Sequence, residues 1–133
     1  MLTEGLKSKK TVTVGAENTA AKVGSGTLPV FATPAMATLC EATAAESVEE
    51  LLGEGKTSVG TLLRLSHVAA TPIGMQVTCE SVLTKIDGRR LVFTLTVYDD
   101  AGVVGECEHE RFVVDSARFL EKALGRRKNT SNG

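Results

Sequence analysis

One long stretch of the chain, residues 31–45 (Phe-Ala-Thr-Pro-Ala-Met-Ala-Thr-Leu-Cys-Glu-Ala-Thr-Ala-Ala), is nearly all apolar and carries a single charge, Glu41. A helix that is apolar on every side is normally buried, so this pattern predicts a central helix that the rest of the chain surrounds. Thr33 can serve as the N-cap of this helix, with Pro34 at its first position. Beyond residue 45, acidic and apolar residues alternate up to Gly53, which indicates two amphipathic turns that emerge into water and end there.

The lone carboxylate of this helix needs an explanation. Burying an ionised carboxylate without a partner costs several kcal/mol, so such a group is normally paired or neutralised. A structural ion pair between Glu41 and either Arg111 or His109 explains the residue as well as a functional role does, and the residues alone leave both interpretations open.

Alternating polar and apolar positions predict a first strand at residues 9–14 and four consecutive strands after the helix. The four later strands cover residues 57–68, 75–86, 90–99 and 103–114. Asp87-Gly88 is the dipeptide that best supports a tight type I′ hairpin between the second and third of them. Gly60 interrupts the first of the four, which indicates either a β-bulge or the close approach of a ligand or another backbone.

The last of these strands has polar groups on both faces. Alternation assigns Glu106, Glu108 and Glu110 to solvent, and Val103, Cys107, His109, Arg111 and Val113 to the inner face. Polar groups on an inner face require partners.

A closing helix is predicted at residues 117–124, capped by Asp115 or Ser116 and ended by Gly125. Residues 15–30 have little periodicity and read as a loop or a lid. The order of elements favours an α+β domain in which an antiparallel sheet curls around one long buried helix. We expect one domain at residues 9–124, a flexible N-terminus at 1–8 and a disordered polar and basic tail at 125–133.

Composition narrows the function. The net charge of −1 and the lack of a basic run before the tail argue against nucleic acid or a membrane as a partner. No segment approaches the roughly 18 apolar residues of a membrane span, and the N-terminus lacks the core of a signal peptide, so a cytoplasmic location is expected. Cys40, Cys79 and Cys107 are odd in number and lack metal-site spacing, which predicts buried free thiols rather than disulfides or a metal site.

An ordered set of short motifs runs through the chain: Phe-Ala-Thr-Pro at the helix start, the lone Glu, Ser-Val-Gly-Thr, a strand His followed by Ala-Ala-Thr-Pro-Ile-Gly, Asp-Gly-Arg-Arg, and His-Glu-Arg. Over residues 9–124 this set resembles the fluoroacetyl-CoA thioesterase-like branch of the hotdog-fold thioesterases. The resemblance implies a hotdog fold, a homodimer with acyl-CoA sites at the subunit interface, and thioester hydrolysis. Pairing of dimers into a tetramer is left open. We expect no metal and no organic cofactor.

The resemblance also assigns residues. A Thr, a Glu and a His form the catalytic set of the fluoroacetyl-CoA enzyme and match Thr33, Glu41 and His67. The family's glycine near the reacting carbonyl matches Gly60, and its arginine on the last strand matches Arg111, which the resemblance assigns to binding of the substrate or the oxyanion. Residues 15–30 are shorter than the family's lid segment and contain no aromatic residue, so the sequence does not predict the fluorine-selective pocket.

Thioester hydrolysis requires a nucleophile or activated water, a proton shuttle and donors for the oxyanion. His67 would act as base and then as acid, since its ordinary pKa lies nearest neutrality. Glu41 would orient His67 or attack the thioester itself, and Thr33 would position water or substrate or act as the nucleophile. Backbone N–H groups around Gly60 and Thr61 would bind the oxyanion.

Each candidate also has a purely structural explanation: a core histidine, an N-cap, an ion pair and a bulge. His109 is a second inner-face histidine of equal standing, and only the resemblance ranks it below His67 as the base. The sequence therefore favours a hydrolase that cleaves a small acyl-CoA thioester. A non-catalytic hotdog module that binds acyl-CoA or a related ligand is the alternative, because a fold does not determine function.

Overall fold

The computed structural model describes residues 1–130. Its strands are β1 (Lys7–Thr13), β2 (Lys56–His67), β3 (Gln76–Asp87), β4 (Arg90–Asp99) and β5 (Gly102–Asp115). Its helices are α1 (Ala20–Val23), α2 (Thr33–Val48) and α3 (Ser116–Thr130), with 3-10 turns at Ala16–Asn18 and Glu49–Leu51.

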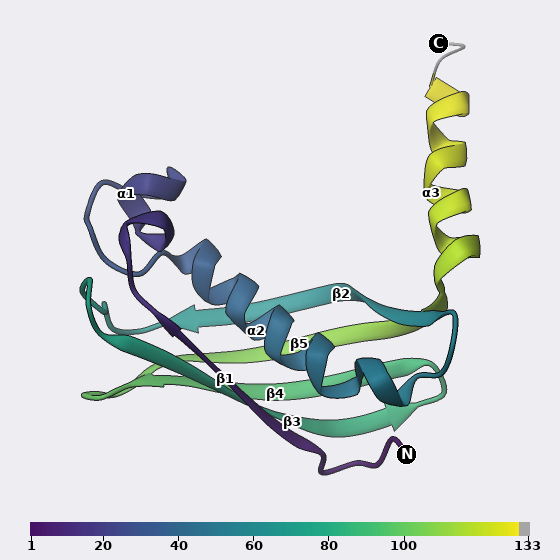
Figure 1. Ribbon diagram of the computed structural model, residues 1–133, viewed down its shortest axis with the longest axis horizontal. Coiled ribbons are helices and arrows are strands. Elements are labelled where there is room, and N and C mark those ends of the chain that lie inside the picture. Colours follow the sequence, from purple (N-terminus) through teal and green to yellow (C-terminus); the bar gives the residue numbers. More distant parts are fainter. Residues whose placement is uncertain (131–133) are drawn as a thin grey trace.

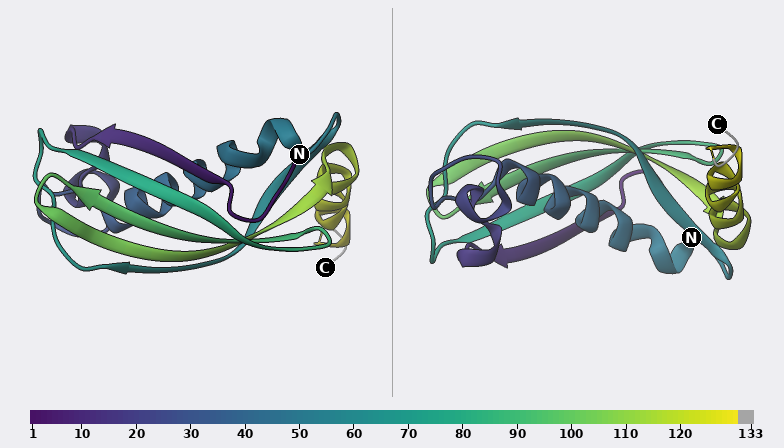
Figure 2. Two further views of the ribbon diagram at one scale, coloured as in Figure 1. Left: turned by 90° about the horizontal axis from the view of Figure 1, so that it is seen from below. Right: turned by 90° about the horizontal axis from the view of Figure 1, so that it is seen from above.

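The five strands form one antiparallel sheet in the order β1-β3-β4-β5-β2, and α2 lies across one face of it (Figure 1). The predicted α+β architecture, a curled antiparallel sheet on a long helix, is confirmed. Seen from below and from above, the strands twist and coil around the helix (Figure 2). The strands β1 and β2 are the two edges of the sheet, so each presents one side without a strand partner in the protomer.

The core lies between α2 and the sheet. On the helix, Met36, Leu39, Cys40, Ala44 and Val48 are buried, and they form one cluster with inward side chains of β3, β4 and β5. The opposite side of α2 is not covered: Pro34 and Thr38 are exposed and Ala42 is half-buried. The prediction of a helix buried on all sides is therefore wrong for the protomer. The prediction fails at the alanine and threonine positions, because exposing a small side chain to water costs little free energy.

The hairpin between β3 and β4 is tight but differs in type from the prediction. Asp87 pairs with Arg90, so the two loop residues are Gly88 and Arg89. Gly88 has φ 60° and no non-glycine residue of the described chain has a positive φ. A positive φ at the first loop residue alone defines type II′, not the predicted type I′.

Both ends of the chain depart from the predicted boundaries. β1 begins at Lys7, and the backbone N–H of Gly5 donates to Leu83 O at 2.7 Å, so part of the segment assigned to a flexible N-terminus joins the sheet. Asp115 caps α3 as predicted, through a 3.0 Å bond from the N–H of Arg118 to its Oδ1. The helix passes through Gly125 and reaches Thr130, so the predicted end at Gly125 and the disordered tail are wrong for residues 125–130. Residues 131–133 lie outside the described residues.

Cys40, Cys79 and Cys107 are buried and free, which confirms the prediction for the thiols. Val103, assigned to the inner face of β5, is exposed, because the β4–β5 register shifts at Val97/Tyr98 and changes the face on which the strand's first residues lie. Within residues 1–130, no helix combines the length and apolar character needed to cross a membrane.

Candidate active site

The structure joins two of the predicted site residues directly. Thr33 Oγ1 lies 2.8 Å from His67 Nδ1, so the first residue of α2 is hydrogen-bonded to the last residue of β2. Thr33 is not the N-cap that the sequence suggested: Ala32 holds that position and makes no side-chain cap. Because the Thr33 hydroxyl is not used to cap the helix, it is available to the imidazole.

The other ring nitrogen of His67 has an unusual environment. His67 Nε2 is buried and has no hydrogen-bond partner anywhere in residues 1–130. Buried polar atoms are nearly always paired, so an orphaned one needs an explanation. Because the atom has no accessible surface in the protomer, a group from a second copy reaches it only when the imidazole or the side chains around it shift.

Glu41 belongs to a second cluster in the middle of α2 and β2. Its side chain is 47% exposed, and its Oε2 lies 3.9 Å from Arg111 Nη1, a loose ion pair. A Cβ on Gly60 would be 2.6 Å from the same Oε2, so the carboxylate rests against the backbone of β2 at this glycine. The ion-pair interpretation of Glu41 is supported, but the carboxylate is only half buried.

Arg111 is buried and held by several acceptors. Its Nε donates to Ser58 Oγ at 2.7 Å, its Nη2 donates to Ser58 O at 2.9 Å, and its Nη1 lies 3.0 Å from His109 Nε2. A guanidinium can only donate, so His109 Nε2 accepts. The rigid fork of the arginine thus presents a fixed positive charge to Glu41.

His109 is neutral in this arrangement. Since its Nε2 accepts from Arg111, the proton is on Nδ1, which donates to Leu62 O at 2.7 Å. Burial lowers the pKa of His109, the bond to Leu62 opposes this shift, and the charge of Arg111 adds to it. This histidine therefore holds Arg111 and the β2 backbone in place and has no free nitrogen for proton transfer.

The β2 strand bulges where these groups meet. Gly60 pairs with Arg111 and Leu62 pairs with Glu110, so Thr61 is the extra residue. The Thr61 hydroxyl donates to the Glu110 carboxylate, and this contact together with Arg90 lowers the pKa of Glu110. The bulge interpretation of Gly60 is supported, and the group that comes close to this glycine in the protomer is the Glu41 side chain rather than a ligand or another backbone.

The two clusters are separate within the protomer. Thr33 and Glu41 are eight residues apart on α2, about 12 Å along the helix axis. No hydrogen bond or ion pair in the described chain links Glu41 to Thr33 or to His67. The sequence identified the residues of both clusters except Ser58, a buried polar residue for which only the Ser-Val-Gly-Thr motif gave a signal.

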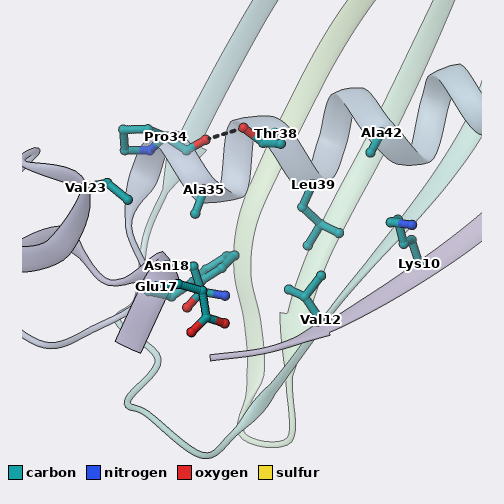
Figure 3. A pocket seen from close by; sticks show the side chains of 11 residues that line it. Lys10, Val12, Glu17, Asn18, Val23, Pro34, Ala35, Thr38, Leu39 and Ala42 are labelled. Atoms are coloured by element: carbon teal, nitrogen blue, oxygen red, sulfur yellow. Dashed lines mark hydrogen bonds between the residues drawn. The ribbon is translucent and has the colours of Figure 1, made fainter. Parts of the chain in front are cut away.

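A groove of about 350 Å³ lies on the other flank of α2, between the helix, β1 and the segment that the sequence read as a lid (Figure 3). Val12, Ala35, Leu39 and Ala42 point into it in Figure 3, with Glu17 and Asn18 below the start of the helix. The lid segment is not an irregular loop: it contains α1, where Thr19 Oγ1 accepts from the N–H of Lys22. Thr33, Glu41 and His67 do not line this groove.

Within residues 1–130, no group of three or more His, Cys, Asp or Glu side chains is arranged to hold a metal ion.

Comparison with known proteins places this geometry in a family. A family model described as fluoroacetyl-CoA-specific thioesterase matches residues 14–117. The fluoroacetyl-CoA thioesterase of Streptantibioticus cattleyicolor is 36% identical over 93 residues, which cover 70% of this chain and 67% of that protein.

Solved structures of thioesterases also superimpose on this chain over most of its length. A phenylalanine-to-alanine variant of the fluoroacetyl-CoA-specific thioesterase FlK superimposes with a TM-score of 0.89 at 27% identity, over 95% of this chain and 98% of that one. A thioesterase superfamily member from Thermus thermophilus gives a TM-score of 0.85 at 25% identity, over 97% and 94%. The sequence match and the shared hotdog fold together show that the chain belongs to the fluoroacetyl-CoA-specific thioesterase family of acyl-CoA thioester hydrolases.

Proposed function

We propose that this protein is a homodimeric hydrolase that cleaves a small acyl-CoA thioester to the free acid and CoA. Thr33 and His67 of one protomer act together with Glu41 of the other. The observation that carries the proposal is the orphaned Nε2 of His67, whose other nitrogen is bonded to a hydroxyl. A hydroxyl, an imidazole and a missing third group form an incomplete nucleophile–base–orienter set.

Edge-to-edge pairing of two copies supplies the missing group. The outer side of β2 has no strand partner in the protomer, and a long open edge is a template for a second copy. Two-fold symmetry makes the two β2 strands antiparallel. With the axis through Arg64, the Gly60–Thr61 bulge lies opposite the partner's His67.

This register brings together complementary groups. The carboxylate of Glu41 rests on Gly60 and is half exposed, so it can accept a further hydrogen bond. Nε2 of the partner's His67 is a donor when Nδ1 accepts from the Thr33 hydroxyl. Each interface would then contain two complete sets of Thr, His and Glu, one at each end of the paired strands.

The reaction follows from these positions. His67 Nδ1 takes the proton from the attacking O–H, of Thr33 or of a water that Thr33 holds, as the oxygen bonds to the thioester carbon. Backbone N–H groups at the Gly60–Thr61 bulge donate to the oxyanion. When the C–S bond breaks, His67 returns the proton to the CoA thiolate. If Thr33 attacks, water then hydrolyses the ester by the same proton transfer.

The roles of Glu41 and Arg111 follow from charge. Glu41 accepts from Nε2 of the partner's His67 and stabilises the imidazolium that forms during attack. Arg111 is buried under Glu41 and fixes the carboxylate, so we assign it a positioning role and not the direct substrate contact expected from the sequence. The family's curated relative is named for fluoroacetyl-CoA. For this chain we propose a small acyl group without selection for fluorine, because the lid segment carries no aromatic residue.

Release of free thiol from short, branched, aromatic and fluoro-substituted acyl-CoAs tests the reaction. We expect turnover of a short-chain substrate by wild type and losses of about 10²- to 10⁴-fold in Glu41→Ala and His67→Ala. Turnover that survives both substitutions would contradict the assigned residues. Tight binding of acyl-CoA with no turnover of any substrate would identify the non-catalytic module instead.

Mixing the two inactive variants tests the shared site. In a heterodimer, the Glu41→Ala chain keeps His67 and the His67→Ala chain keeps Glu41, so one of the two sites is intact. After random exchange of subunits we expect about one quarter of wild-type activity. A site contained in one chain would give no recovery, and Glu41→Ala mixed with itself is the matched control.

A further inference from the structure

The helix α3 has almost no packing partner in its own protomer. It leaves the sheet at the end of β5 and rises alone past β2 (Figure 1), and the other views show it as a column at one end of the molecule (Figure 2). Every residue from Ser116 to Leu124 is exposed. Isolated helices of about 12–15 residues are marginal in water, and most helices in proteins depend on packing of an apolar face.

This helix has such a face. Phe119, Leu120 and Leu124 are large apolar residues that are each 45% or more exposed. Together with Ala117 and Ala123 they fall on one side of the helix at 100° per residue, while Arg118 and Lys122 fall on the other. The apolar face of this amphipathic helix therefore lies in solvent, without the apolar packing partner that such a sequence pattern normally has.

The direction of α3 indicates where that surface lies. Asp115 pairs with Lys56, and the N–H of Ser116 donates to Gly55 O at 2.9 Å, so α3 begins beside the first residue of β2. In Figure 1 it extends beyond the β2 edge, away from β3 and β4. This is the side on which a second copy would add its own β2.

An exposed apolar patch lies at the opposite end of β2. It consists of Val68, which is 67% exposed, and of Val103, which is 52% exposed. The N–H of Val68 donates to Val104 O, so Val68 and Val103 are neighbours. The protomer's own α3 is the length of β2 away, about 40 Å for 12 residues, and cannot cover this patch.

Antiparallel pairing of two β2 strands brings these surfaces together, since the start of one strand lies beside the end of the other. The charges beside the contact also match: Arg126 flanks the apolar face of α3, whereas the end of the sheet that carries the patch exposes Asp100 and Glu106. We propose that α3 crosses to a second copy of this chain and packs its apolar face on that copy's Val68 and Val103, next to the Thr33–His67 pair. This inference rests on the proposed homodimer and adds a second, helical contact to it.

Cysteine cross-linking tests the crossing in the full-length protein. Leu120→Cys combined with Val103→Cys should give a covalent dimer on mild oxidation, because the two positions are far apart in one chain and adjacent across the dimer. The two single variants are the controls and should remain uncross-linked. Light scattering on the same samples separates the possible failures. A dimer without cross-links overturns the docking of α3 alone, whereas a monomer overturns the homodimer and this inference with it.

A second measurement does not depend on cross-linking geometry. Leu120→Gln with Leu124→Gln should raise the dimer dissociation constant by about 10-fold or more, since two apolar side chains leave a buried contact. Glu121→Gln, on the polar side of the same helix, should leave it within about twofold. Equal dissociation constants for wild type and the double variant would show that α3 does not contribute to the interface.

Discussion

A methyl group on the Cα of Gly60 would lie 2.6 Å from Glu41 Oε2. Real Cβ atoms do not approach an oxygen so closely, so glycine at this position leaves the space that the carboxylate occupies. The same methyl would be 3.2 Å from His109 Cε1 and 3.4 Å from Arg111 Nη1, which are both held by other bonds. Glu41, on the mobile end of a side chain, is the group that would move.

Gly60→Ala should therefore displace the Glu41 carboxylate and leave the fold intact. We expect kcat/KM to fall by about 100-fold, the usual consequence of a misplacement of about 1 Å in a catalytic group. The measurement is free-thiol release together with a circular dichroism spectrum that matches wild type. In a Glu41→Gln background the same substitution should change kcat/KM little, and a full additional 100-fold loss there would mean that Gly60 acts by another route.

The fold could be predicted because its signals are local. Alternation identified every strand of the sheet to within two residues, and Asp115 was recognised as a cap from its own chemistry. The end of α3 could not be found in this way. A helical glycine costs only about 1 kcal/mol relative to alanine, so Gly125 weakens the helix without stopping it.

The site was predictable as a set of residues but not as an arrangement. Thr33 fits an N-cap by residue type, and only the position of β2 shows that its hydroxyl meets His67 instead. The separation of Glu41 from His67 depends on how far α2 and β2 run side by side, a tertiary fact without a sequence pattern. The neutrality of His109 likewise follows from the contact with Arg111 across one face of the strand β5.

Thr33→Val tests the hydroxyl of the Thr33–His67 pair. Valine keeps the shape of threonine and removes the donor, so His67 Nδ1 loses its partner at 2.8 Å. We expect kcat to fall by about 10²-fold or more, with a stability loss of about 1 kcal/mol because Thr33 is exposed. Thr33→Ser keeps the hydroxyl and should retain most of the activity. Equal activity of the valine and serine variants would exclude the hydroxyl from the reaction.

Arg111→Lys should destabilise the protein although it keeps the charge. A lysine cannot reproduce the fork that bonds both Ser58 atoms and His109, so buried acceptors lose their donors. We expect the free energy of unfolding to fall by about 2–4 kcal/mol, measured by urea denaturation. Arg64→Lys is the matched control, since Arg64 pairs with Glu108 on the surface, and it should change stability by less than about 0.5 kcal/mol. A similar loss in both variants would contradict the role assigned to the buried network.

The pH dependence of stability should report the buried state of His109. Its pKa in the folded protein is lowered by burial, while in the unfolded chain it is about 6.5. As pH falls through that unfolded value, the unfolded chain binds a proton that the folded protein does not, so the folded state loses stability. The loss levels off once pH passes below the folded pKa. Above about pH 7.5, well past the unfolded value, the contribution of His109 is complete.

The His109→Asn variant isolates the contribution of His109 to the pH dependence of stability. The asparagine amide can replace the Nδ1–H donor toward Leu62 O, and it does not titrate. Wild type should lose free energy of unfolding between about pH 7.5 and pH 5.5, and His109→Asn should lose less over the same range. The carboxylates of Glu80 and Glu110 do not interfere, since their neighbours hold each pKa below its ordinary value and outside this window. His67 is the other histidine of the chain and is present in both proteins, so the difference between them belongs to His109. Parallel pH profiles for the two proteins would mean that His109 binds its proton over the same pH range in the folded protein as in the unfolded chain, and the acceptor role of His109 Nε2 toward Arg111 would then be wrong.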